Sequence, residues 1–157
     1  MEKNKLAIIL LGKQNSGKTS TIKYFDKKYD EYNRNKKYCK KGWRHLQLFK
    51  EELGALFSLI YFIPASPSET NFPLKDRLKE FKPELLLVAE QENGKEYENT
   101  IQFLDDNNYE IEVFNLQRIK SANIWNEWTK ETMEGILDNR ATTIRNTFKS
   151  FILRRIK

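Results

Sequence analysis

The chain has 157 residues, of which 39% are hydrophobic and 32% are charged, and this composition is typical of a single globular domain rather than of a disordered chain. Its one cysteine, Cys39, excludes an internal disulfide framework and an all-cysteine metal site, and it fits a reducing cytoplasm. The longest apolar run, residues 53–63, is about half the ~20 residues of a membrane span. We therefore expect one cytoplasmic domain without a transmembrane segment.

The first elements alternate between strand and helix. Residues 6–11 form a continuous apolar run, which suits a strand buried on both faces. A helix is predicted from Gly17, with apolar side chains at helical spacing along residues 22–29. Residues 44–49 and 55–63 read as two strands joined by a short turn, and such strands pair antiparallel.

The alternation continues to the C-terminus. The patterns predict a helix near residues 70–81, capped by Thr70 or Asn71, followed by a strand at 85–89, a helix at 97–104 and a strand at 109–116. A long amphipathic segment follows from Ser121, with Gly135 and Asp138-Asn139 as candidate breaks between two helices. Together these elements predict an α/β fold for residues 1–157 as a single domain. We expect about five strands, mostly parallel, with an antiparallel edge hairpin, helices on both faces, and 121–157 as a C-terminal helical segment packed on the sheet.

The turn after the first strand carries the strongest motif. The pattern G-x-x-x-x-G-K-[ST] is matched by Gly12, Lys13, Gln14, Asn15, Ser16, Gly17, Lys18 and Thr19. In such a loop, glycines let the backbone approach a phosphate, and inward-pointing N–H groups join the positive end of the following helix. Lys18 is the candidate catalytic residue because it reaches the β- and γ-phosphates, and the Thr19 hydroxyl is placed to ligate Mg²⁺. Ser20 completes the predicted nucleotide-binding set.

On these residues the chain resembles the P-loop NTPase superfamily, and its layout is closest to the kinase–GTPase side. The resemblance is strong over residues 6–25 and architectural elsewhere. It implies a three-layer fold with the first strand in the middle of the sheet, and ATP or GTP bound with Mg²⁺ at the C-terminal strand ends. The resemblance does not imply a particular reaction, but a complete phosphate loop beside an incomplete hydrolytic apparatus favours a slow or partner-stimulated NTPase. A small-molecule or nucleoside kinase and a nucleotide-gated module that binds nucleic acid or protein are the alternatives.

A second acid normally holds Mg²⁺ in such a site. Glu90, directly after the strand at 85–89, is the better local match, and Glu69, several residues after the run 55–63, is the weaker one. The D-x-x-G and N-K-x-D patterns that are typical of GTPases are absent from the sequence, so guanine specificity has no support.

Basic residues suggest further ligands. Arg118, Lys120 and Arg140 are candidate phosphate-side cations, although each is more often a surface residue, and His45 has no neighbouring acid that would make it catalytic. Residues 26–44 interleave tyrosines with lysines, a composition that suits an anionic substrate or nucleic acid as well as a solvated loop. The apolar stripe of the C-terminal helical segment most simply covers the sheet, and it is also long enough for a homodimer contact.

Overall fold

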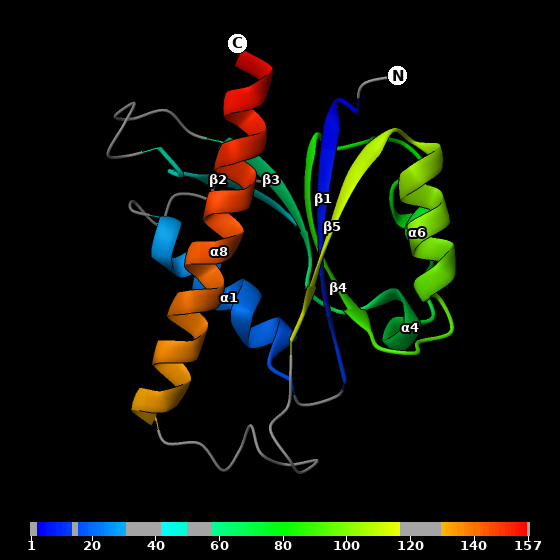
Figure 1. The fold of residues 1–157 in the computed structure, drawn as a ribbon. Helices are drawn as coiled ribbons and strands as arrows, with labels where there is room; N and C mark the ends of the chain where they lie inside the picture. The colour runs from blue at the N-terminus through cyan, green and yellow to red at the C-terminus, as the bar shows by residue number, and fades with distance from the viewer. Residues whose placement is uncertain (1–2, 14–15, 31–41, 50–57, 117–129, 157) are drawn as a thin grey trace.

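A five-stranded mixed sheet forms the centre of the fold in the computed structural model, which describes residues 3–13, 16–30, 42–49, 58–116 and 130–156. The strands lie in the order β2-β3-β4-β1-β5 (Figure 1). Neighbouring strands are parallel except β2 and β3, which pair antiparallel at one edge, so the predicted edge hairpin is confirmed. The strands are β1 Lys5–Gly12, β2 Trp43–Leu46, β3 Ser58–Ile63, β4 Leu85–Gln91 and β5 Tyr109–Asn115.

Strand β1 is buried on both faces, as its uninterrupted apolar sequence predicts. Leu6, Ile8 and Leu10 belong to one hydrophobic core, and Ala7 and Ile9 belong to the core on the opposite face. Strand β1 lies between β4 and β5 and pairs in parallel with both. The middle strand of the five is β4, and β1 is displaced from it by one position.

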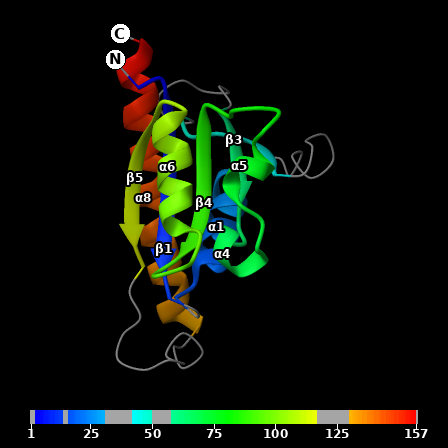
Figure 2. The ribbon, with the colours of Figure 1, turned by 90° about the vertical axis from the view of Figure 1, so that its right-hand side faces the viewer.

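Helices cover both faces of the sheet (Figures 1 and 2). On one face lie α1 (Lys18–Tyr29) and α8 (Lys130–Ile156). On the other lie α4 (Pro67–Thr70), α5 (Leu74–Arg77) and α6 (Tyr97–Asp106). None of the described helices has both the length and the apolar composition that crossing a bilayer requires.

Helix α8 closes the core that it shares with α1. Four of its apolar side chains are buried at spacings of three and four residues: Ala141, Ile144, Phe148 and Phe151. Burying each of the larger ones contributes about 1.5–3 kcal/mol. The helix runs unbroken through Gly135 and Asp138, so the predicted split into two helices is wrong for the described residues. A side chain at Gly135 would meet only open space, which means that no packing contact forces a break there.

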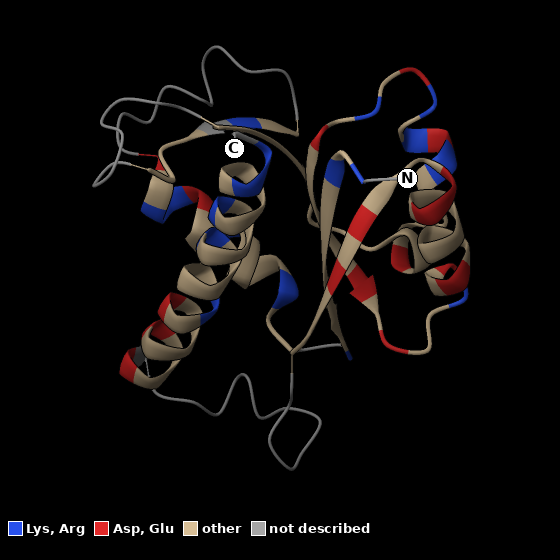
Figure 3. Ribbon diagram, turned by 45° about the horizontal axis from the view of Figure 1, so that its top comes forward, with Lys and Arg blue, Asp and Glu red and all other residues tan. Residues whose placement is uncertain are grey.

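The charges of α8 are segregated along its length. Glu131 lies in the first turn, and Arg154 and Arg155 lie in the last turn, an arrangement that complements the helix dipole (Figure 3). The two arginines also pair with Glu110 and Glu84, at 2.8 and 2.9 Å. The C-terminal end of α8 is therefore tied to β5 and to the residue that precedes β4.

The chain between β3 and β4 forms two short helices instead of the one predicted over residues 70–81. Helix α4 begins after Ser66, whose hydroxyl accepts a hydrogen bond from the Glu69 N–H at 3.1 Å. It ends at Thr70, and the next residue, Asn71, has a left-handed φ of 55°. The residue before Pro73 is disfavoured in helical conformation, so the chain cannot continue directly into α5.

Candidate functional site

The loop at residues 12–19 joins the carboxyl end of β1 to the N-terminus of α1, where the motif predicted a strand-to-helix turn (Figure 1). Residues 14–15 lie outside the described part of the chain. Gly17 has a φ of 84°, a left-handed conformation that glycine adopts without a steric penalty. The Ser16 N–H donates to the Lys13 carbonyl at 3.2 Å, so the chain turns back on itself within the loop.

The start of the loop is closely packed. A Cβ atom on Gly12 would lie 2.3 Å from the Ser16 hydroxyl oxygen and 3.0 Å from the carbonyl oxygen of Leu116. Ser16 is 1% exposed, and its hydroxyl has no hydrogen-bond partner among the described residues. Close approach to Ser16 and to the chain after β5 therefore explains why glycine occupies the first position of the motif.

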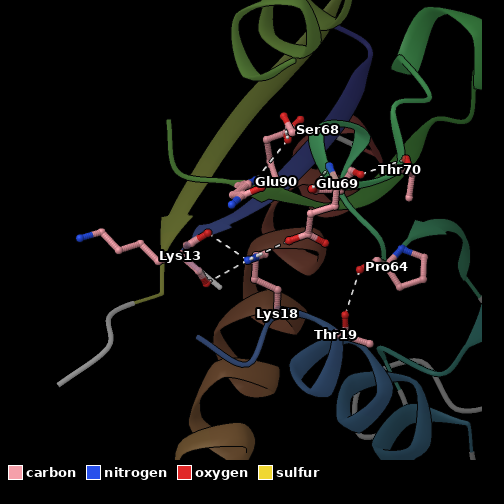
Figure 4. Close-up of polar contacts among 11 residues, drawn as sticks. Lys13, Lys18, Thr19, Pro64, Ser68, Glu69, Thr70 and Glu90 are labelled. Carbon is pink, nitrogen blue, oxygen red and sulfur yellow. Dashed lines mark hydrogen bonds and ion pairs between the residues drawn. The ribbon is translucent and has the colours of Figure 1, made fainter. Parts of the chain in front are cut away.

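The ammonium group of Lys18 folds back over this loop. It donates to the carbonyls of Gly12 and Lys13, at 2.9 and 3.1 Å, and the residue is only 7% exposed. Its Nζ also lies 3.9 Å from Glu69 Oε1 (Figure 4). Glu69 is 41% exposed, so this pair is worth about 0–1 kcal/mol and a stronger anion can displace it.

The N-terminus of α1 lies at the same point. Gly17 offers no side-chain cap, and the first turn of the helix contains no acidic residue. The positive end of the helix dipole is therefore not neutralised within its own first turn. The exposed Thr19 hydroxyl donates to the Pro64 carbonyl at 3.1 Å, which brings the end of β3 to the start of α1. Ser20 is the third residue of α1 and is half-buried.

Glu90 lies apart from this group in a polar network of its own. Its carboxylate is fully buried and accepts hydrogen bonds from the Ser68 hydroxyl at 3.1 Å, the Gln91 N–H at 3.1 Å and the Thr100 hydroxyl at 2.8 Å. Figure 4 shows the carboxylate directed to Ser68, the neighbour of Glu69 in α4. Glu90 thus joins α4 to α6, and its assignment as a Mg²⁺ ligand stays a prediction.

Strand alternation accounts for the partners of Glu90. Leu86 and Val88 of β4 belong to the core on the α5 and α6 face, and Glu90, two residues further on, points to that same face. Helix α1 covers the opposite face, and the three hydrogen bonds described for Glu90 come from Ser68, Gln91 and Thr100 rather than from the loop. Among the described residues, Glu69 is an acid that the structure brings to the loop, although its position several residues after the run 55–63 made it the weaker candidate in the sequence.

Of the three candidate cations, only Arg140 falls in the described part of the chain. Its Nη1 donates to the Ser16 carbonyl at 2.8 Å and to the Thr21 hydroxyl at 3.2 Å, and burial lowers the pKa of its guanidinium. Arg140 therefore contacts the loop through the protein backbone. Arg118 and Lys120 lie outside the described residues.

Of the basic segment 26–44, the structure describes only the two ends. Asp26 of α1 accepts a hydrogen bond from Arg44 Nε of β2 at 3.1 Å, so the ends of the segment are tied together. His45 lies in β2. Residues 31–41, which carry most of the predicted contacts to an anionic partner, lie outside the described part.

Comparison of the chain with protein-family models, curated proteins and solved structures found no match. Within the ranges that the structure describes, no three or more His, Cys, Asp or Glu side chains are grouped so that they could hold a metal ion. The group that does converge consists of a buried ammonium, an uncapped helix N-terminus, a hydroxyl and an exposed carboxylate.

Proposed function

We propose that the protein binds a nucleoside triphosphate, ATP or GTP, with Mg²⁺ on the loop at residues 12–19, as a P-loop NTPase. The position of Lys18 carries this proposal. Its nearly buried ammonium lies over the loop, at the start of a helix that has neither a side-chain cap nor an acid in its first turn. A cation beside a helix N-terminus favours a multiply charged anion such as a polyphosphate.

The polar groups at the loop suit the chemistry of phosphoryl transfer. Catalysis of this reaction depends mainly on positioning and on neutralising charge on the phosphates. Lys18 supplies a fixed positive charge, because two carbonyls orient its ammonium. Thr19 and Glu69 are the residues that would hold Mg²⁺, which prefers oxygen ligands and, when bound, neutralises charge on the phosphates.

We infer that the protein hydrolyses the nucleotide slowly unless a partner assists. Glu69 pairs with Lys18 and is not held where it would orient an attacking water. Glu90, the other acid considered, is engaged by three donors on the opposite face of the sheet. A site of this kind binds and positions the nucleotide, and it depends on another molecule for a group that activates water.

Thermal unfolding with ATP, GTP, ADP and GDP, each with and without Mg²⁺, tests the binding proposal. A nucleotide at a hundred times its Kd adds about 2.7 kcal/mol, which raises the Tm of a domain of this size by about 5–11 °C. Lys18→Ala should remove the shift. Lys82→Ala is the matched control, because Lys82 also donates to a backbone carbonyl, that of Leu78 at 2.7 Å, but lies outside the loop. A wild-type protein that responds to no nucleotide, or a Lys18→Ala variant that responds fully, would refute the proposal.

The role of Glu69 predicts that replacing it tightens nucleotide binding without Mg²⁺ and reduces the affinity gained by adding Mg²⁺. Without the metal, Glu69→Gln should tighten nucleotide binding, since a negative charge 3.9 Å from Lys18 no longer repels the phosphates. With the metal, the same variant should gain less affinity from Mg²⁺ than the wild type does. Isothermal titration in both buffers measures the two effects. A variant that is weaker in both buffers, or unchanged in both, would contradict this role.

A further inference from the structure

An arginine from α8 contacts the far side of the nucleotide loop. Arg140 Nη1 donates to the Ser16 carbonyl at 2.8 Å and to the Thr21 hydroxyl at 3.2 Å. The Thr21 hydroxyl in turn donates to the Gly17 carbonyl at 2.6 Å. One guanidinium is thus connected, directly or through one hydroxyl, to two consecutive carbonyls of the loop.

These contacts determine which way the loop's N–H groups point. In a trans peptide the carbonyl and the N–H of the next residue point in opposite directions, and the described chain contains no cis peptide. Because the Ser16 carbonyl faces Arg140, the Gly17 N–H faces away from Arg140 and from α8. Helices α8 and α4 lie on opposite faces of the sheet (Figure 1), and α4 carries Glu69, which pairs with Lys18.

The backbone that carries Arg140 is fixed to α1 on both sides of it. Asp138 accepts hydrogen bonds from Lys28 at 2.7 Å and from Tyr24 at 3.1 Å. The hydrogen bond from Lys28 holds the pKa of Asp138 below its usual value, so this carboxylate is charged near neutral pH. Lys28 also donates to the Thr142 hydroxyl at 3.1 Å. The arginine is therefore presented to the loop from a stable position on α8.

We propose that Arg140 is a positioning residue for nucleotide binding: it holds the Ser16 carbonyl behind the loop and so presents the Gly17 N–H to a phosphate. This inference rests on the proposed function of the loop. Arginine suits the task because its planar guanidinium carries several donors and stays protonated even when buried. A lysine here would supply a single ammonium that is more strongly hydrated and less well oriented.

Two variants of Arg140 and one control test the proposal on the full chain. Arg140→Met keeps most of the side-chain stem and removes every donor, and Arg140→Lys keeps one charged donor group. Arg145→Met is the control, because Arg145 lies on the same helix and its Nε donates to a backbone carbonyl far from the loop, that of Leu48, at 3.0 Å. Calorimetry measures the affinity for Mg²⁺–ATP and for Mg²⁺–pyrophosphate, which has phosphates but no base or sugar. The ¹⁵N–¹H resonance of Gly17, recorded without nucleotide, reports the peptide orientation directly.

We expect Arg140→Met to weaken ATP and pyrophosphate binding by the same factor, about tenfold or more, because the loss is confined to phosphate contacts. The Gly17 resonance should move in Arg140→Met and stay in place in Arg145→Met, and Arg140→Lys should recover part of the affinity. If Arg140→Met does not fold, Arg140→Lys serves as the test variant. It should lose less affinity for ATP and pyrophosphate than expected for Arg140→Met, and its Gly17 resonance should still move.

Several outcomes would overturn the inference. They are an affinity within twofold of wild type for Arg140→Met, an equal loss in Arg145→Met, or a Gly17 resonance that does not move. A wild-type protein that binds neither ATP nor pyrophosphate would refute the proposed function instead. In that case the Gly17 resonance would still decide whether Arg140 shapes the loop.

Discussion

Replacing Glu90 distinguishes a carboxylate that holds the fold together from one that binds metal. Its three hydrogen bonds come from Ser68, Gln91 and Thr100, and Thr100 is itself 1% exposed. In Glu90→Ala the Thr100 hydroxyl loses its acceptor in a site that water does not reach. A buried donor without a partner costs about 1–3 kcal/mol, and the cavity left by the side chain adds to this. We expect a loss of about 2–4 kcal/mol, or a fall in Tm of about 4–16 °C.

Urea unfolding measures this loss of stability, and two further variants, Glu92→Ala and Glu90→Gln, provide comparisons. Glu92→Ala removes an exposed carboxylate two residues away and should change the free energy of unfolding by less than about 0.5 kcal/mol. Glu90→Gln keeps one carbonyl acceptor, and a hydroxyl facing its amide can rotate to accept, so its loss should be about half that of Glu90→Ala.

One experimental result would contradict a structural role for Glu90. If Glu90→Ala unfolds at the same urea concentration as the wild type and requires more Mg²⁺ to bind nucleotide, then the carboxylate is a metal ligand. The buried network that joins α4 to α6 would then have no energetic role, and the sequence-based choice of Glu90 would be restored.

Tyr109→Phe tests the core, and two glycine-to-alanine substitutions test the loop backbone. Tyr109 is buried and donates a hydrogen bond to the Pro83 carbonyl, and burial raises the pKa of its phenol. The neutral phenol should therefore stabilise the fold fully below the unfolded pKa of about 10, and this stabilisation should be lost at higher pH. Tyr109→Phe should cost about 1 kcal/mol at pH 8 in urea unfolding and remove this group's part of the alkaline loss; an unchanged pH profile would contradict the assignment. Gly17→Ala places a Cβ at a φ of 84° and should cost about 1–2 kcal/mol in thermal unfolding, whereas Gly135→Ala, in an open helical position, should stabilise by up to about 1 kcal/mol. Equal effects from the two alanines would show that Gly17 is not left-handed.

The features that were predictable from sequence are those whose cause is local. The apolar run at residues 6–11 predicts a strand buried on both faces, and β1 is one. The glycine pattern predicts a turn into a helix, and α1 begins at Lys18, directly after left-handed Gly17. The antiparallel pairing of β2 and β3 was predictable because the two strands are neighbours in the chain, although β2 ends at Leu46 rather than at residue 49 and β3 begins at Ser58 rather than at residue 55. Each inference needs only a few consecutive residues and the steric limits of the backbone.

Strand order and the covering of the two faces were not predictable in this way. Alternation along β4 puts Leu86, Val88 and Glu90 on one side, but no local pattern says which helix covers that side. The helix that covers this side determines that Glu90 bonds to Thr100 of α6, and α4 places Glu69 beside Lys18 at the loop. Arg140 meets the Ser16 carbonyl across 124 positions of chain, and only the packing of α8 on α1 brings them together. Long-range contacts depend on how all the apolar surfaces are buried at once, and that is a property of the folded whole rather than of any segment.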